Sequence, residues 1–190
     1  MARILSRFLS QKKATGLALT LDLHGLQLYS DSLAADAPAT LTLKAASVPA
    51  GGERVVTAVI PVANPRLWSA EEPNRYLLTA TLTEGKKALE TVSAYTGLRT
   101  VELRDVAQAD DEYGEGGRFF LVNGKPVKLR GVDRHETDPS AGHAINRDRM
   151  EQDIMLMKQN NINHVRNSHY PDDQYWYYLC DRYGIYLVDE

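Results

Sequence analysis

The end of the chain alternates between strand-like and helix-like segments, and this alternation restricts the possible folds more than any other feature. Residues 147–160 (RDRMEQDIMLMKQN) have apolar side chains at helical spacing, namely Met150, Ile154 and Met157. Asn146 directly precedes this segment and is a predicted N-cap. Strands separated by helices pair in parallel through right-handed crossovers. The sequence therefore predicts an α/β unit with a parallel sheet.

A further strand, helix and strand continue this pattern. INHVR at 162–166 and IYLVDE at 185–190 are predicted strands. Between them Pro171-Asp172 opens a helix, with Asp172 as the expected cap, and Gly184 ends it. The apolar face of this helix consists of Trp176, Leu179, Cys180 and Tyr183.

Residues 16–103 have a different pattern, in which apolar and polar side chains alternate with a period of two. This period places one face of each strand on a core and the other in water. Short strands separated by turns predict an antiparallel sandwich of the immunoglobulin type. We expect Trp68 to pack in this sandwich or to cap one end of it, with sugar stacking as the alternative. The predicted strands are LALTLDL, TLTLKAASV, RVVTAVIPV, RYLLTATLT, LETVSAYTG and RTVEL.

Two segments outside these patterns mark the domain boundaries. Residues 104–117 are acidic and glycine-rich, and they predict a linker. The dipeptide Asn123-Gly124 then predicts a type I′ hairpin that begins a second domain at 118–190. Residues 1–15 are basic and lack acidic side chains, so we expect a leader with little order, a transit peptide being the alternative.

Composition excludes several classes of partner. The 22 Lys and Arg against 25 Asp and Glu give a net charge of −3, which offers no basic surface for nucleic acid or for an anionic membrane. No apolar run reaches the roughly 20 residues that span a bilayer. A single cysteine, Cys180, on the apolar face of a predicted helix suits a reducing compartment, and we expect a cytoplasmic protein in which this thiol is structural.

Polar side chains gather where the three predicted parallel strands end. The first of these strands is VKLRGV at 127–132, and residues 133–136 (DRHE) follow it. Residues 166–169 (RNSH) end the second strand, and Asp189 and Glu190 end the third. In a parallel α/β sheet or a (β/α)₈ barrel, this edge carries the ligand site. The sequence therefore predicts a polar pocket here, rather than three unrelated solvated loops.

The residue types in this pocket suit glycoside hydrolysis. A retaining glycosidase needs two carboxylates about 5 Å apart, and Asp133, Glu136, Asp189 and Glu190 are available, although spacing alone does not select a pair. His135 and His169 lack the helical spacing of a zinc motif, so we favour hydrogen bonds to sugar hydroxyls over metal binding.

Two long motifs identify a family resemblance. FFLVNGKPVKLRGVDRHETDP and QDIMLMKQNNINHVRNSHYPDDQYWYYLCDRYGIYLVDE resemble the start of the catalytic barrel in glycoside hydrolase family 2. NPRLWSAEEPNRYLLTATL and YTGLRTVEL resemble the immunoglobulin-like sandwich that precedes that barrel. RHE followed by DP, and LMKQNN, are most similar to the β-galactosidases, whereas SHYP is shared with β-glucuronidases. The implied fold is a sandwich followed by the first three strands of an incomplete (β/α)₈ barrel.

The resemblance also implies roles for particular residues. His135 and His169 would contact the sugar and stabilise the transition state, and Arg166 would orient the nucleophile. The acid/base and nucleophilic glutamates of the family lie on later strands, and its Mg²⁺ ligands begin after residue 190. We therefore expect no catalytic carboxylate, no metal ligand and no activity in this chain by itself.

Three functions follow from these expectations. The first is a fragment of a retaining β-galactosidase that hydrolyses terminal β-D-galactosides. The second is a fragment of a β-glucuronidase or another family 2 glycosidase, and the third is a non-catalytic carbohydrate-binding or interaction module. Because three strands do not close a barrel, the strand at 185–189 would be an open edge, and we expect self-association or a homo-oligomer.

Overall fold

The strand Leu17–Gly25 (β2) alternates buried and half-buried side chains along its whole length, as the period-two pattern predicts. It lies inside a four-stranded antiparallel sheet in the order β3-β2-β5-β6. The other strands are Ala39–Lys44 (β3), Tyr76–Glu84 (β5) and Lys87–Thr96 (β6). The computed structural model describes residues 2–10, 12–44 and 47–190, the first of these ranges by its main chain.

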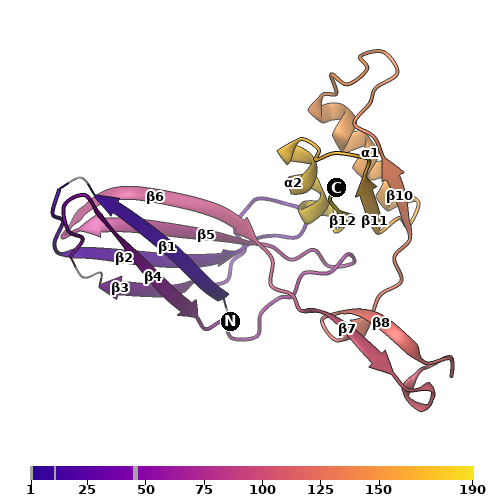
Figure 1. Cartoon of the computed structure of the whole chain (residues 1–190), viewed down its shortest axis with the longest axis horizontal. Coiled ribbons are helices and arrows are strands. Elements are labelled where there is room, and N and C mark those ends of the chain that lie inside the picture. The colour runs from indigo at the N-terminus through magenta and orange to yellow at the C-terminus, as the bar shows by residue number, and fades with distance from the viewer. Residues whose placement is uncertain (1, 11, 45–46) are drawn as a thin grey trace. The chain divides into compact units, whose positions relative to one another are not determined.

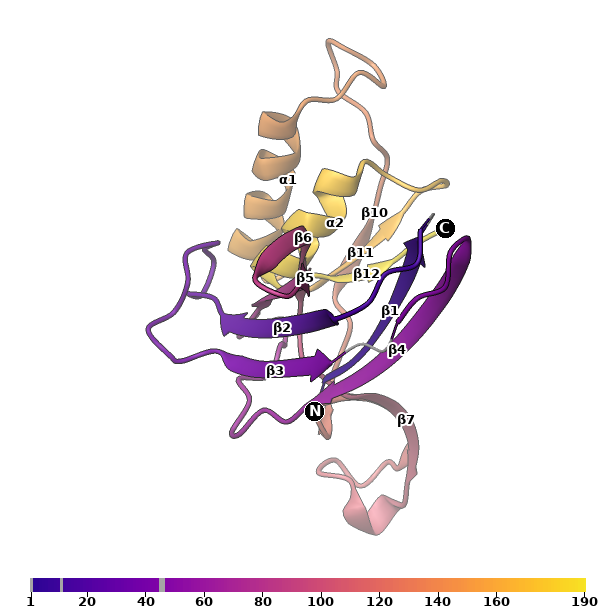
Figure 2. The ribbon, with the colours of Figure 1, turned by 90° about the vertical axis from the view of Figure 1, so that its left-hand side faces the viewer.

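A second, two-stranded layer covers one face of this sheet (Figures 1 and 2). It consists of Ala2–Ser10 (β1) and Gly52–Ile60 (β4) in antiparallel register. Ala58 and Ile60 of β4 pack against Leu19, Leu21 and Leu23 of β2 to form the core. These layers make the expected sandwich, which occupies one compact unit, residues 1–66 and 75–98.

The structure differs from the sequence prediction at the start of the chain. Residues 1–15 were expected to form a leader with little order, but Ala2–Ser10 pairs with β4 over its full length. Strand edges carry unsatisfied N–H and C=O groups, which a neighbouring extended segment satisfies whatever its charge.

The second compact unit comprises residues 67–74 and 99–190. Its parallel sheet has the order β10-β11-β12, formed by Gly131–Arg134 (β10), His164–Asn167 (β11) and Tyr186–Val188 (β12). The helices Arg147–Gln159 (α1) and Gln174–Tyr183 (α2) connect these strands. This arrangement confirms the first three strands of a barrel.

The helices pack on one face of the parallel sheet. Met150, Ile154 and Met157 of α1 are buried with Val165 of β11 and Trp176 of α2. Cys180 is buried in the same cluster, and burial raises the pKa of its thiol, which suits a structural role.

The helix ends follow local sequence rules, with one exception. The Asn146 side chain accepts a hydrogen bond from the Arg149 N–H at 2.9 Å, as expected of an N-cap. Gly184 ends α2 with φ 75°. The cap of α2 is Asp173, whose carboxylate accepts from the Tyr175 N–H at 2.7 Å. The expectation that Asp172 is the cap is wrong, because that side chain turns inward to an arginine.

A small antiparallel sheet precedes the barrel strands. It consists of Val101–Val106 (β7), Gly117–Val122 (β8) and Lys125–Pro126 (β9), with a short 3-10 helix at Gln108–Asp110. Asn123 and Gly124 have φ 53° and 76°, as a type I′ turn requires. Part of the expected linker 104–117 is strand, since β7 runs to Val106 and β8 begins at Gly117. The predicted strand RTVEL pairs with β8 in the second unit and does not extend the sandwich sheet.

Trp68 also lies in the second unit. Its indole N–H donates to the Asp181 carbonyl at 2.8 Å, and its ring meets the Tyr186 ring edge to face at 5.5 Å. Trp68 is therefore a packing residue, but of the barrel unit rather than of the sandwich unit. The connection 67–74 is held there by Lys158, whose ammonium donates to the Ala70 carbonyl at 2.8 Å.

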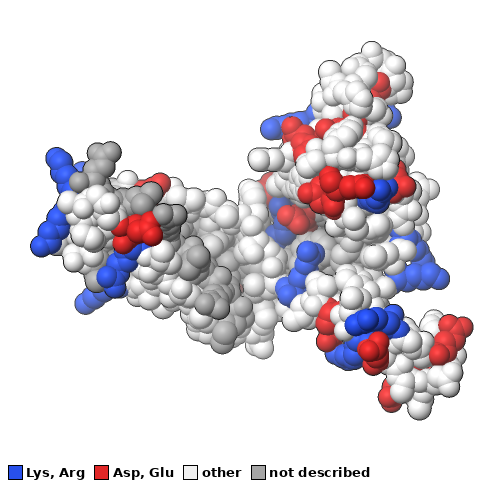
Figure 3. Space-filling view, viewed as in Figure 1, with Lys and Arg blue, Asp and Glu red and all other residues white. Residues whose placement is uncertain are grey.

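The surface carries charges of both signs. Basic and acidic side chains lie interspersed on the face shown in Figure 3. Within the described ranges, no helix has both the length and the hydropathy needed to cross a membrane.

Candidate active site

Arg166 lies at the centre of the polar face at the C-terminal ends of β10, β11 and β12. The parallel register places it between Asp133 and Val188. Its guanidinium lies 3.3 Å from Asp133 Oδ1 and 2.5 Å from Glu190 Oε2. One arginine on the middle strand thus binds a carboxylate from each side, so residues from all three strand ends do converge.

The two predicted histidines face each other at this edge. The ring centroids of His135 and His169 are 5.3 Å apart, with an interplanar angle of 78°. His169 Nδ1 lies 3.2 Å from Arg166 Nη2 and 3.2 Å from Glu190 Oε2. A ring nitrogen either accepts from the guanidinium or donates to the carboxylate, so the imidazole tautomer selects the partner. Both histidines are exposed, so a ligand can reach them.

The contacts hold this face in a charged state. The hydrogen bond to Asp133 raises the pKa of Arg166, which is therefore permanently cationic. Bonds from His169 and Arg166 lower the pKa of Glu190. Such a face offers imidazole and guanidinium donors beside carboxylate acceptors, a combination that suits hydroxyl-rich ligands.

The other two candidate carboxylates have structural partners. Glu136 Oε1 accepts from the Asp173 N–H at 3.0 Å, at the start of α2. Asp189 Oδ1 accepts from the Tyr177 hydroxyl at 2.6 Å and from the Asn167 amide at 3.2 Å. Neither contacts Arg166 in the way that Asp133 and Glu190 do.

Sequence reasoning placed Arg134 and Asn167 among the polar residues of the strand ends, but it did not predict that they are buried under this face. Arg134 and Asp172 are an ion pair with side-chain exposures of 5% and 0%. Asn167 is fully buried and accepts from the Trp176 indole N–H at 3.2 Å. Their place at the ends of predicted strands indicated the pocket, but nothing in the spacing of the sequence joins them to Asp172 or to α2.

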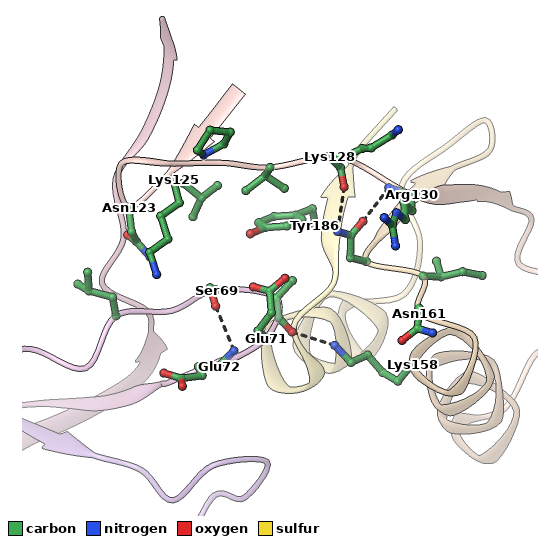
Figure 4. A pocket seen from close by; sticks show the side chains of 17 residues that line it. Ser69, Glu71, Glu72, Asn123, Lys125, Lys128, Arg130, Lys158, Asn161 and Tyr186 are labelled. Carbon is green, nitrogen blue, oxygen red and sulfur yellow. Dashed lines mark hydrogen bonds between the residues drawn. The ribbon is translucent and has the colours of Figure 1, made fainter. Parts of the chain in front are cut away.

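A separate cavity of about 880 Å³ lies at the opposite, N-terminal end of the barrel strands. Figure 4 shows the side chains that line it. Several of the polar side chains that line it already form hydrogen bonds with other groups of the protein. Lys158 donates to the Ala70 carbonyl, and Asn163 bonds the Arg130 N–H and the Lys128 carbonyl. Asn123 donates to the Trp68 carbonyl. This cavity lies where the connection 67–74, the hairpin and the parallel sheet meet, and its polar side chains hold these segments together. The candidate active site therefore remains the face at the C-terminal ends of the strands.

Comparison with known proteins decides the family. A model described as Glycosyl hydrolases family 2 matches residues 10–99, and a model of the TIM barrel domain of the same family matches residues 116–190. The chain belongs to glycosyl hydrolase family 2. The sandwich match ends beside the boundary between the two compact units at Leu98 and Arg99.

Solved family 2 structures have the same fold. A Bacteroides uniformis β-glucuronidase is 28% identical over 98% of this chain and 20% of that chain, with a TM-score of 0.70. A second one from that organism, β-glucuronidase 2 covalently bound to cyclophellitol-6-carboxylate aziridine, is 30% identical over 97% and 20%, with a TM-score of 0.68. A β-galacturonidase from Eisenbergiella tayi bound to galacturonate is 25% identical over 98% and 29%, with a TM-score of 0.70. The chain thus spans 20% to 29% of the length of these relatives.

We find no metal-ligand group of three or more His, Cys, Asp or Glu side chains within residues 12–44 and 47–190. His135 and His169 instead contact each other and, at His169, Arg166 and Glu190. The Mg²⁺ ligands that the family resemblance implies were expected after residue 190, and this expectation stays a prediction.

Proposed function

We propose that this chain forms one side of the active site of a retaining family 2 glycosidase that hydrolyses terminal β-D-galactosides. In this proposal His135 and His169 bind the sugar, and Arg166 orients the nucleophilic carboxylate. The observation that carries the proposal is the convergence of these three side chains at the C-terminal ends of consecutive parallel strands. That end of a barrel carries the active site in characterised enzymes.

The chemistry of each side chain fits its proposed role. An imidazole donates to a sugar hydroxyl without the desolvation cost of a full charge. Preorganised donors whose bonds tighten as the ring approaches an oxocarbenium-like state lower the barrier rather than only binding substrate. Arg166 already binds two carboxylates in this chain, which is the interaction that keeps a nucleophilic carboxylate ionised.

We infer that residues 1–190 alone do not hydrolyse galactosides. The family resemblance assigns the acid/base glutamate and the nucleophile to later strands, and the Mg²⁺ ligands to positions after residue 190. The test is release of nitrophenol from a nitrophenyl β-galactoside by a homogeneous sample of the chain. Turnover above that of a His135→Phe, His169→Phe double variant would contradict this part of the proposal.

A uronidase is the second candidate, favoured by the names of the relatives. The structures at 25% to 30% identity are β-glucuronidases and a β-galacturonidase. The RHE, DP and LMKQNN segments favour the galactosidase instead. The decisive experiment joins this chain to the later barrel strands of a family 2 enzyme and compares kcat/KM for nitrophenyl β-galactoside, β-glucuronide and β-galacturonide. A preference for either uronide would replace the galactosidase proposal.

A non-catalytic binding module remains the third candidate. Histidine ring signals in NMR are the suitable probe, because both tryptophans are buried and a sugar on the open face would not contact them. We expect millimolar galactose to shift the His135 and His169 signals and to leave His24, in the sandwich unit, unchanged. Galactose shifts that map to the sandwich would favour the module. We further propose a cytoplasmic location, from the single buried thiol.

A further inference from the structure

A buried polar layer lies directly under the candidate active face. We use this name for five side chains that link the three strand ends to the two helices: Arg134, Asp153, Asn167, Asp172 and Trp176. None of them belongs to the sugar-contacting set. They matter because of where two of them stand. Arg134 ends β10 next to His135, and Asn167 ends β11 next to Arg166.

Arg134 is the centre of the layer on the first strand. Its Nη1 donates to Asp172 at 2.8 Å and its Nε to Asp153 at 3.1 Å, so it joins β10 to α1 and to the segment just before α2. The guanidinium also lies 4.0 Å from the centroid of the Trp176 ring. The planar guanidinium lies over the aromatic ring and donates hydrogen bonds in its own plane, so these contacts together allow one preferred orientation. The end of β10 is therefore fixed in direction as well as in position.

Asn167 has the same function on the second strand. It has no exposed surface, and both ends of its amide are used. Its oxygen accepts from the Trp176 indole, and its nitrogen donates to Asp189 at the end of β12. A buried amide satisfied at both ends is held in one rotamer.

The exposed histidines adjoin these fixed points. His135 directly follows Arg134, and the Ser168 N–H, next to His169, donates to the Arg134 carbonyl at 2.8 Å. The main chain carrying the two imidazoles is thus joined at Arg134. The imidazoles themselves are exposed, so support from the buried polar layer reaches them through this main chain.

We propose that Arg134 and Asn167 are positioning residues that hold His135 and His169 in their mutual geometry. This inference rests on the proposed function for its biological meaning. A misplacement of about 1 Å is enough to reduce catalysis strongly, so a rigid support has a direct consequence for rate. The layer acts through the histidines and does not itself touch the sugar.

The test uses the full 190-residue chain with its histidine rings isotopically labelled. The five histidines give few signals, and the 5.3 Å ring separation predicts a cross-peak between the His135 and His169 rings. We expect Arg134→Met and Asn167→Leu to weaken this cross-peak by about threefold or more, because it falls with the inverse sixth power of a distance that grows by about 1 Å. Arg134→Lys, which keeps the charge beside Asp172, recovers part of it.

Met157→Ala is the matched control, because Met157 is buried in the helix–sheet core and is not part of the layer. It lowers the Tm while leaving the cross-peak intact. Trp176→Phe removes only the indole hydrogen bond to Asn167, and it replaces Asn167→Leu in the test if that variant does not fold. A normal cross-peak in the Arg134 and Asn167 variants, or an equal loss in Met157→Ala, overturns the proposal. The experiment contains no sugar, so its result is independent of whether the proposed function holds.

Discussion

The Arg134 guanidinium donates to the Asp172 carboxylate across 2.8 Å, and the Asp172 side chain has no exposed surface. Burial raises the pKa of Asp172, and the adjacent Arg134 opposes that rise. A carboxyl with a raised folded pKa contributes stability below its unfolded pKa of about 3.9, and this contribution is lost as the pH rises through the folded value.

Arg134→Met leaves Asp172 buried without its cation. We expect the free energy of unfolding of the barrel unit to fall by about 3 to 5 kcal/mol at pH 7, because an unpaired buried charge is costly. The loss should be smaller near pH 4, where the carboxyl is protonated. Urea unfolding followed by tryptophan fluorescence measures this unit selectively, since Trp68 and Trp176 both belong to it.

Arg149→Met is the control for that prediction. Arg149 forms a more exposed pair with Asp153 at 3.5 Å, so its removal should cost less than about 1 kcal/mol at either pH. Equal losses at pH 4 and pH 7 in Arg134→Met would show that the Asp172 charge is not the cause.

Gly184, at the end of α2, allows the connection 67–74 to pack closely against it because it has no side chain. Its φ is 75°, and an added Cβ would lie 2.4 Å from the Ala70 carbonyl oxygen. We expect Gly184→Ala to lower the stability of the barrel unit by about 2 to 4 kcal/mol, from left-handed strain plus this contact. Gly124 has a similar φ of 76° but nothing within 4 Å, so Gly124→Ala should cost about 1 kcal/mol. Equal losses in urea unfolding would rule out the contact with Ala70.

The outer barrel strands offer a route to self-association. β10 and β12 are the edges of their sheet, and Val132 and Val188 are 38% and 46% exposed. Open edges with apolar side chains recruit further chains. We predict oligomers of residues 1–190 at tens of micromolar in light scattering, and dissociation on Val188→Lys. Val92→Lys, on the sandwich edge strand β6, should have no effect, and a strict monomer in the unchanged chain would contradict the prediction.

Local rules predicted much of this fold, and long-range contacts account for the differences. The predictions of an N-cap at Asn146 and of a turn at Asn123-Gly124 are confirmed, because a cap and a tight turn depend on neighbouring residues. The position of Trp68 depends on Asp181, far along the chain, and the strand at Ala2–Ser10 depends on a partner edge.

The candidate site shows the same division. The strand ends that carry His135, Arg166 and His169 follow from the alternation of strands and helices. The Arg134–Asp172 pair has no periodic signal. Asp172 was expected to cap α2 because Pro171-Asp172 opens the predicted helix, whereas the cap is the next residue, Asp173.

The central claim is that His135 and His169 act on the sugar in a family 2 active site. The most direct measurement is steady-state hydrolysis and a thermal melt for His135→Phe and His169→Phe, in a polypeptide that joins this chain to the later barrel strands. We predict that each substitution lowers kcat by about 10²- to 10³-fold, with a smaller change in KM, as for other preorganised donors. A near-normal kcat in both variants, with only a lower Tm, would contradict the claim.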